Sequence, residues 1–186
     1  MKKITLLLSA LMLSGMAMKA QVYMCKETNV TFFSATPMEN IEAKNKSVEG
    51  AINTKNGQVQ IKVHNIGFVF DKPLMQEHFH ENYMETVKYP HAILKGNIVE
   101  TVDWTKDGST DVTVKGTMEM HGVKKDVVVK GKVVIAGGKI SIEAKFPIKV
   151  ADYGIKVPSL VMKNIAEEVQ VTIVSKMEPL PPKKTN

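Results

Sequence analysis

The residues best suited to chemistry lie in the middle of the chain, where His78 and His80 are flanked by Glu77 and Glu81. If this stretch were a β-strand, the two imidazoles would point to the same side and could bind one metal ion such as zinc. If it is a helix, residues two positions apart diverge and cannot share an ion. No third ligand follows at a recognisable spacing, so no metal site is predicted, and for His78 we favour a hydrogen bond to the backbone.

Two other reactive side chains are His121 and Cys25. His121 precedes Gly122 at an expected hairpin tip, where it can cap exposed carbonyl groups. A catalytic triad needs a nucleophile and an acid placed around the histidine, and chain order alone does not supply them. No G-x-S-x-G, phosphate loop or H-E-x-x-H occurs. Since Cys25 is the only cysteine, it forms no internal disulfide and is expected to be a small, at least half-buried strand residue. We predict no catalytic residues and no cofactor.

The first residues have the pattern of a secretory signal peptide. Lys2 and Lys3 precede a short apolar run over residues 4–13, and small or flexible residues follow up to Ala20. The run is too short to span a bilayer, and no later stretch is apolar enough to do so. We therefore expect residues 1–20 to be removed, with Ala17 as an alternative cleavage point, and the mature chain to be exported, either periplasmic or secreted. Residues 178–186 are rich in proline and lysine and are predicted to form a disordered tail.

The charge of the chain is only mildly positive once the signal peptide is removed. The formal net charge is +6, and loss of Lys2, Lys3 and Lys19 leaves +3 (6 − 3). Every cation is a lysine, because the sequence contains no arginine. Bidentate recognition of phosphate or guanine by arginine is therefore absent, and we expect no nucleic-acid partner.

Residues 75–96 interrupt a chain that otherwise alternates between apolar and polar positions. We predict that residues 75–89, called the lid below, form a short helical insert between strands. Asp71 is expected to cap this helix with Pro73 in its first turn, and Pro90 to end the insert. Helical turns are also expected at residues 38–43 and 161–167. A bend is expected near Gly67, after which Ile66, Phe68 and Phe70 share one face.

Strand patterns cover most of the remaining chain. The clearest alternation runs over residues 110–120, with one face formed by Val112, Val114, Gly116, Met118 and Met120. We expect about eight strands joined mostly by short turns, and no alternation of helices with strands. The sequence therefore predicts an all-β fold, an antiparallel β-barrel of about eight strands with a short helical lid insert, and an open sandwich is the alternative.

Three motifs in this order resemble the YceI-like family, a lipocalin-like family associated with polyisoprenoid binding. The first is Met75…His78-Phe79…Tyr83-Met84…Tyr89-Pro90…Gly96. The second, residues 112–125, is similar to the family's G-x-L-x-x-H-G-V-T hairpin, and the third, Asp152-Tyr153-Gly154-Ile155, resembles its D-F-G-I turn. The resemblance covers roughly residues 30–175. It implies that residues 21–177 form one lipocalin-like domain.

The inward face is aliphatic and rich in methionine, which fills irregular space and adapts to a flexible guest. Composition alone favours an ordinary filled core, whereas the resemblance implies a cavity for a lipid. The family often has a basic residue before its D-F-G turn, but here Lys149-Val150-Ala151 precede the turn without arginine. A strong pyrophosphate grip is therefore not expected, and a quinone or a neutral lipid head is left open.

We therefore expect a non-catalytic, exported protein that holds a long-chain isoprenoid or similar amphiphile for transport or sequestration, with a homodimer left open. The alternatives are a metal-dependent hydrolase or isomerase using His78, His80 and His121, and a ligand-free structural or stress-response domain. The expected ligand-binding residues are Phe68, Phe70, Met75, His78, Phe79, Tyr83, Met84, Val112, Val114, Met118, Met120, Ile142, Phe146 and Ile148.

Overall fold

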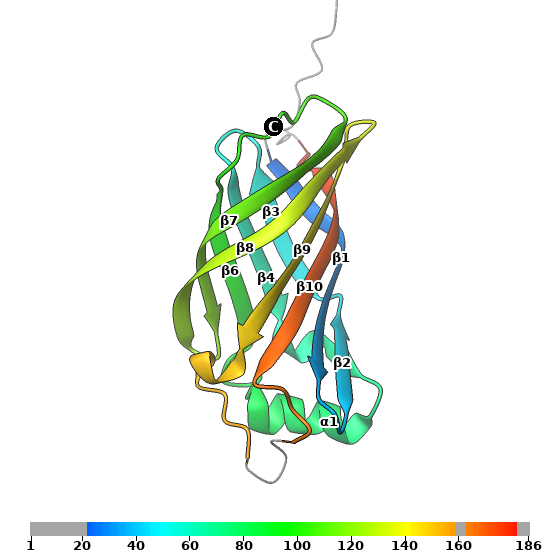
Figure 1. The fold of residues 1–186 in the computed structure, drawn as a ribbon. Coiled ribbons are helices and arrows are strands. Elements are labelled where there is room, and N and C mark those ends of the chain that lie inside the picture. The colour runs from blue at the N-terminus through cyan, green and yellow to red at the C-terminus, as the bar shows by residue number, and fades with distance from the viewer. Residues whose placement is uncertain (1–21, 159–162, 182–186) are drawn as a thin grey trace, which may run out of the picture.

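The computed structural model describes residues 22–158 and 163–181, and the predicted signal peptide lies outside the described residues. The described chain is mostly strand, with its helical segments gathered at one end (Figure 1). In chain order the elements are β1 (Val22–Ala35), β2 (Asn40–Asn45), β3 (Val48–Asn53), β4 (Gln58–His64), η1 (Asn65–Gly67), β5 (Phe68–Phe70), α1 (Pro73–His78), η2 (Phe79–Tyr83), β6 (His91–Ile98), β7 (Gly108–Met120), β8 (Val123–Ala136), β9 (Lys139–Lys149), η3 (Val150–Tyr153) and β10 (Glu168–Pro179).

Eight of the strands close into an antiparallel barrel. The order around the ring is β10-β9-β8-β7-β6-β4-β3-β1, and β1 pairs again with β10. The closing register runs from Tyr23↔Pro179 to Phe33↔Gln170. Closure pairs strands that would otherwise present free edges. The predicted fold class, an antiparallel lipocalin-like barrel of eight strands with a short helical insert, is confirmed.

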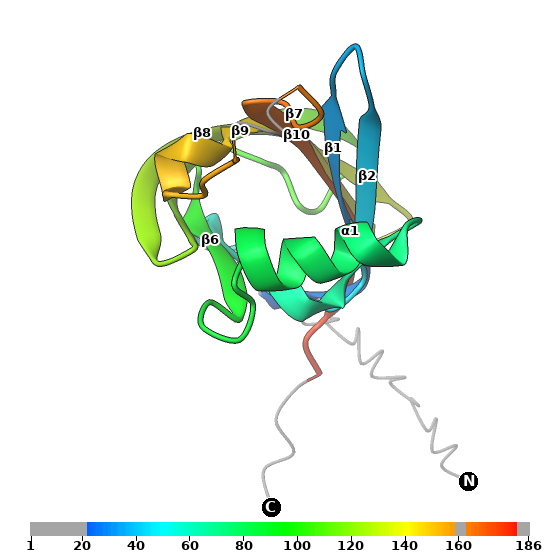
Figure 2. The same cartoon turned by 90° about the horizontal axis from the view of Figure 1, so that it is seen from below.

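The strands β2 and β5 extend the wall at one end of the barrel. β2 and β3 pair with different parts of β1, and β5 pairs with β2 as β4 pairs with β3. β6 follows β4 as far as the pair His64↔His91, whereas β5 is paired with β2. The wall therefore separates between β5 and β6. The lid connects these two strands and lies across this end of the barrel (Figure 2).

Two buried asparagines hold the bends that produce this separation. Asn45 ends β2 and Asn65 follows β4, and their side chains are 1% and 0% exposed. Asn45 Nδ2 donates to the His64 carbonyl oxygen at 2.8 Å, and the Ser47 amide donates to Asn45 Oδ1 at 2.7 Å. Gly67 packs against the same place, where a Cβ would lie 2.7 Å from Asn45 Oδ1. The side-chain amides thus replace hydrogen bonds that a continuous ladder would make.

The alternation predicted for β7 is confirmed. Val112, Met118 and Met120 are buried, Val114 is half-buried, and the flanking charged residues are exposed. Gly116 lies on the same inward face and pairs with Gly96 of β6. A Cβ at Gly116 would overlap the carbonyl oxygen of Lys95, so the close approach of these strands requires glycine. Cys25 is half-buried on β1 as expected.

Three local predictions are wrong. Residues 38–43 form no helical turn, because Thr36 Oγ1 accepts the amide of Glu39 and the chain returns as β2 beside β1. Asp71 does not cap the lid helix, since Lys72 occupies that position without a side-chain bond. Ile66 does not share the inward face of Phe68 and Phe70: the 3-10 turn η1 rotates it outward, where it is 65% exposed.

The two remaining boundary predictions concern the C-terminal part of the chain. The expected helical turn over residues 161–167 falls partly outside the described residues, and residues 163–167 contain no helix. β10 continues through Pro179, so the first residues of the predicted tail are part of the barrel. Within residues 22–158 and 163–181, no helix is long and apolar enough to cross a membrane.

Adjacent valines on β8 provide a test of the inward face. Val129 is 2% exposed and Val128 is 61% exposed. Val129→Asp should lower the free energy of unfolding by at least about 3 kcal/mol, because it buries an unpaired carboxylate. Val128→Asp should change it by less than about 0.5 kcal/mol, because the new side chain reaches solvent and faces Lys115. Urea denaturation of both variants measures this difference, and equal losses would contradict the assigned face.

Candidate functional site

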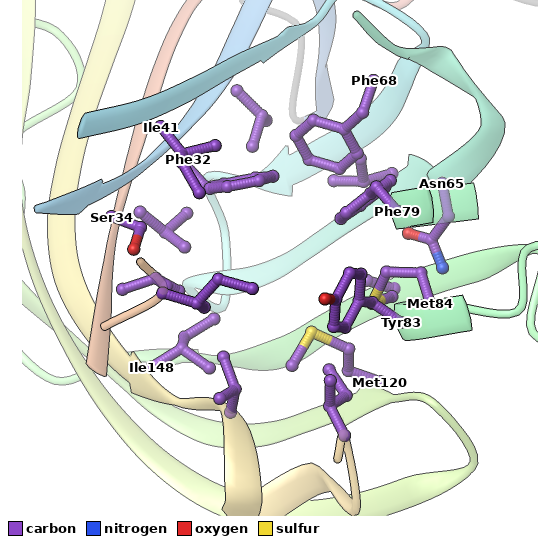
Figure 3. A pocket seen from close by; sticks show the side chains of 18 of the residues that line it. Phe32, Ser34, Ile41, Asn65, Phe68, Phe79, Tyr83, Met84, Met120 and Ile148 are labelled. Carbon is purple, nitrogen blue, oxygen red and sulfur yellow. The ribbon is translucent and has the colours of Figure 1, made fainter. Parts of the chain in front are cut away.

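A cavity of about 280 Å³ lies inside the lid end of the barrel. Its wall is formed by β-strands from around the barrel and by α1 and η2, and its lining is almost entirely apolar (Figure 3). We call it the main cavity. Most of the predicted ligand-binding residues line it: Phe68, Phe70, Met75, His78, Phe79, Tyr83, Met84, Met118, Met120, Phe146 and Ile148.

The other predicted residues, Val112, Val114 and Ile142, lie farther along the barrel and line a second space of about 50 Å³. Ile61, Leu94 and Ile173 line both spaces, so the two follow one another along the interior. The structure thus brings all the predicted residues to the inner wall but divides them between two levels. Whether they contact a ligand stays a prediction.

Phe79 joins the lid to the barrel wall. Its ring stacks on Phe32 of β1 with centroids 5.5 Å apart, and it meets Phe68 and Phe70 at 5.4 and 5.0 Å. Figure 3 shows Phe32, Phe68 and Phe79 grouped at one side of the main cavity. Such tilted and offset ring pairs add to the area that they bury. Phe32 was not among the predicted lining residues, although it lies in phase with the buried positions Val30 and Ser34.

Both ends of the lid are anchored to the strands that it connects. At the start, the Phe70 amide donates to Gln76 Oε1 at 3.1 Å. At the end, the Asn65 amide donates to the Pro90 carbonyl oxygen at 2.9 Å, and Asn65 Nδ2 donates to the Tyr89 carbonyl oxygen at 2.7 Å. The hydrogen bonds between β4 and β6 end at the pair His64↔His91. Beyond this pair, Asn65 makes hydrogen bonds to the end of the lid instead. Asn65 was not predicted as a site residue, because its only signal in the sequence is the change of phase near Gly67.

His121 fastens the lid to the opposite side of the barrel mouth. Its Nδ1 is hydrogen-bonded to the Tyr153 carbonyl oxygen and its Nε2 to Glu85 Oε2, each at 3.0 Å. The Tyr89 ring packs on the imidazole with centroids 4.3 Å apart. Glu85 has φ 44°, a left-handed conformation that costs roughly 1–2 kcal/mol outside glycine. The expected role of His121 in capping a carbonyl group is confirmed, and neither ring nitrogen is left to act as a general base in the cavity.

The histidines proposed as an alternative metal site are not gathered together. His78 lines the main cavity, but His80 does not, as expected for residues two apart on a helix. Both ring nitrogens of His80 are buried without a hydrogen-bond partner, and the predicted backbone hydrogen bond of His78 is not formed with any described residue. In the part of the chain that the structure describes, no three His, Cys, Asp or Glu side chains are placed to hold a metal ion.

Charge is nearly absent from the main cavity. Its described lining includes one carboxylate, Glu39, and no lysine. Glu39 accepts hydrogen bonds from Lys72 Nζ at 2.6 Å and Asn164 Nδ2 at 3.3 Å, and the bond from Lys72 holds the pKa of Glu39 below its ordinary value. Burial raises the pKa of Tyr83, so its hydroxyl remains neutral. This interior suits an uncharged apolar guest and offers no cationic grip for a phosphate.

The comparisons with known proteins agree with this geometry. Residues 23–177 match the sequence model of the YceI-like domain. No curated protein matches the chain in sequence.

Three solved structures share the fold. A polyisoprenoid-binding domain from Saccharophagus degradans, implicated in plant cell wall breakdown, superimposes with a TM-score of 0.73 at 18% identity, over 87% of this chain and 100% of that one. BcnA of Burkholderia cenocepacia superimposes with a TM-score of 0.68 at 17% identity, over 80% of this chain and 95% of that one. The YceI protein of Campylobacter jejuni superimposes with a TM-score of 0.58 at 11% identity, over 75% of this chain and 85% of that one. At these identities the likeness concerns the fold alone.

The pairing of His121 with Glu85 can be measured by a double-mutant cycle. His121→Ala, Glu85→Ala and the double variant should give a coupling of about 0.5–1 kcal/mol in urea denaturation, because the pair is partly exposed. Both single variants should also speed limited proteolysis within the lid.

The control is the pair of His64 with Glu49, which has a similar distance of 2.9 Å but lies on more exposed side chains. His64→Ala and Glu49→Ala should leave proteolysis of the lid unchanged. A coupling near zero for His121 with Glu85, together with unchanged proteolysis, would show that this pair does not fasten the lid.

Proposed function

Since residues 23–177 match its domain model, the chain belongs to the YceI-like family, and we propose that it is a lipid-binding protein. It holds a long-chain isoprenoid or similar amphiphile inside the barrel, for transport or sequestration. The observation that carries this proposal is the apolar main cavity beneath the lid. A filled core of the same composition would leave no such space.

The size of the main cavity bears on what the closed barrel can hold. Small-molecule sites typically measure about 300–1,000 Å³, so 280 Å³ is at the lower limit. At this limit, a long chain fits completely only if the lid moves outward or the second space opens. Lid movement is therefore part of the proposal.

Apolar contact alone supplies enough affinity. Each buried methylene contributes about 0.8 kcal/mol, so a chain of about twenty carbons, once lid movement lets all of it enter, gives roughly 16 kcal/mol against an association cost of about 4–15 kcal/mol. The protein then needs few specific contacts to the head of the ligand. This matches an interior with no lysine among its described lining residues.

The proposed role is non-catalytic. His121, the histidine best placed for proton transfer by sequence, is bound through both nitrogens to Tyr153 and Glu85. Of the lid histidines, His78 lines the apolar cavity and is otherwise exposed, and His80 is half-buried away from it. Neither arrangement supplies a paired acid and base next to a space for a substrate.

We further propose that the protein works outside the cytoplasm, periplasmic or secreted. Lys2, Lys3 and the apolar residues 4–13 support this, as a signal peptide would direct export. An exported carrier with an apolar interior shields a lipid from water between two places.

Replacing Phe79 distinguishes a lid that controls ligand release from a lid that only fills the end of the barrel. Phe79→Ala removes the ring contacts with Phe32, Phe68 and Phe70 and should lower the free energy of unfolding by about 3 kcal/mol. If the lid gates a ligand, the variant should also release a bound fluorescent polyene at least several times faster than the parent protein. Stopped-flow fluorescence against an excess of acceptor vesicles measures this rate.

Ile140→Ala is the matched control. Ile140 is 2% exposed, so the loss of stability should be similar, but it lines neither cavity. Its release rate should equal that of the parent. An unchanged release rate in Phe79→Ala would show that the lid does not control ligand release. If neither the polyene nor any prenyl probe bound to the parent protein, the proposed function itself would be wrong.

A further inference from the structure

One buried polar atom at the wall of the main cavity has no partner. Asn65 is 0% exposed and lines the cavity, and its Oδ1 makes no hydrogen bond with any described residue. Its other polar groups are all used. The backbone amide donates to the Pro90 carbonyl oxygen at 2.9 Å, Nδ2 donates to the Tyr89 carbonyl oxygen at 2.7 Å, and the backbone carbonyl accepts the amide of Phe68. Oδ1 is therefore a buried acceptor without a donor. It has no accessible surface while the lid is closed, so a ligand group reaches it only when the lid moves outward.

The orientation of this amide is fixed by its neighbours. Exchanging Oδ1 and Nδ2 would set two acceptors, the side-chain oxygen and the Tyr89 carbonyl oxygen, 2.7 Å apart. The oxygen must therefore occupy the free side, which in Figure 3 is the side turned toward the cavity. Asn45, the other asparagine at the strand bends, differs because its Nδ2 and Oδ1 are both bonded.

The remaining lining limits which donor can reach Oδ1. No lysine is among the described lining residues, so a ligand diphosphate would be buried without a lysine counter-charge from this part of the chain. The Tyr83 hydroxyl lies on the same lid side of the cavity and makes no hydrogen bond with a described residue (Figure 3). On the lid side of the cavity, the polar groups without a partner among the described residues are thus the Asn65 side-chain oxygen, the Tyr83 hydroxyl and the His78 imidazole.

These groups match an alcohol. A hydroxyl donates through its hydrogen and still accepts through its oxygen, so it can satisfy Asn65 Oδ1 and receive a bond from a hydroxyl such as that of Tyr83. A quinone, an aldehyde or an ether has only acceptors and would leave Oδ1 unpaired. Sites with a buried hydrogen-bonding group discriminate strongly against analogues that cannot pair with it.

We propose that Asn65 Oδ1 accepts a hydrogen bond from a hydroxyl group of the ligand, and that the protein selects neutral long-chain alcohols. This rests on the proposed function and specifies the head group for the same site. Prenyl diphosphates and ligands whose heads only accept hydrogen bonds are the compounds that it rejects.

The test compares one prenyl chain with different heads. Geranylgeraniol, its methyl ether and its diphosphate are titrated against the full chain in competition with a fluorescent polyene. The alcohol should bind about tenfold more tightly than the ether, which has nearly the same apolar area but no donor. The diphosphate should bind more weakly than both.

Two variants assign the preference to Asn65. Asn65→Leu keeps a similar volume and removes the acceptor, so the ratio of alcohol to ether affinity should fall close to one. Asn45→Leu is the control, because it removes a buried asparagine that lines neither cavity, and its ratio should remain about tenfold. The ratio does not depend on the fraction of protein that is folded, and if Asn65→Leu does not fold, the ligand series on the parent protein decides.

Several results would overturn the inference. Equal binding of alcohol and ether to the parent would mean that Asn65 only braces Tyr89 and Pro90. A preference that persists in Asn65→Leu would place the acceptor elsewhere. Both results leave the proposed function intact, because a prenyl probe still binds, whereas failure of every prenyl probe to bind would remove the proposed function and this inference together.

Discussion

The bend between β4 and β5 is the constraint on which the rest of the structure depends. At Asn65 the chain turns away from β6, and the barrel wall separates between β5 and β6. An open wall exposes both an apolar interior and backbone groups without ladder partners, and each is costly in water. The lid meets both needs, because Phe79 covers the interior while Asn65 binds the backbone at the end of the lid. The cavity exists where a regular strand pair would have closed the wall.

The same constraint explains why the interior is neutral. The strands carry their lysines and acids on the outer face, where they form exposed pairs such as Lys176 with Glu27. Inward positions are apolar apart from a few polar groups, and these are mostly paired: Thr28 with Ser175 across β1 and β10, and Ser34 with the Ala166 amide. Binding then depends on apolar contact, and specificity depends on the few polar atoms that remain unpaired. Asn65 Oδ1 is such an atom, and it lies where the lid meets the wall.

The features that the sequence predicted are strand faces and turns, because alternation and turn residues act locally. The inward face of β7, the hairpin tip at Gly122 and the position of the lid all follow from periods of two residues and their interruption. What it missed depends on contacts between distant segments. Residues 38–43 contain no strong strand pattern, and residues 40–43 belong to β2 because β1 and β5 lie on either side of that strand. Phe32 and Phe79 are far apart in sequence, and the role of Asn65 depends on Tyr89, which the chain brings back only after the whole lid.

We propose above all that the barrel encloses an apolar ligand and is not filled by its own side chains. Native mass spectrometry of the full chain purified from its own host tests this most directly, with organic extraction of the same sample. We predict a mass above that of the polypeptide, lost on denaturation, and a lipid with a prenyl or similar chain in the extract. A protein that shows only the mass of its polypeptide, with no lipid in the extract, would contradict the claim.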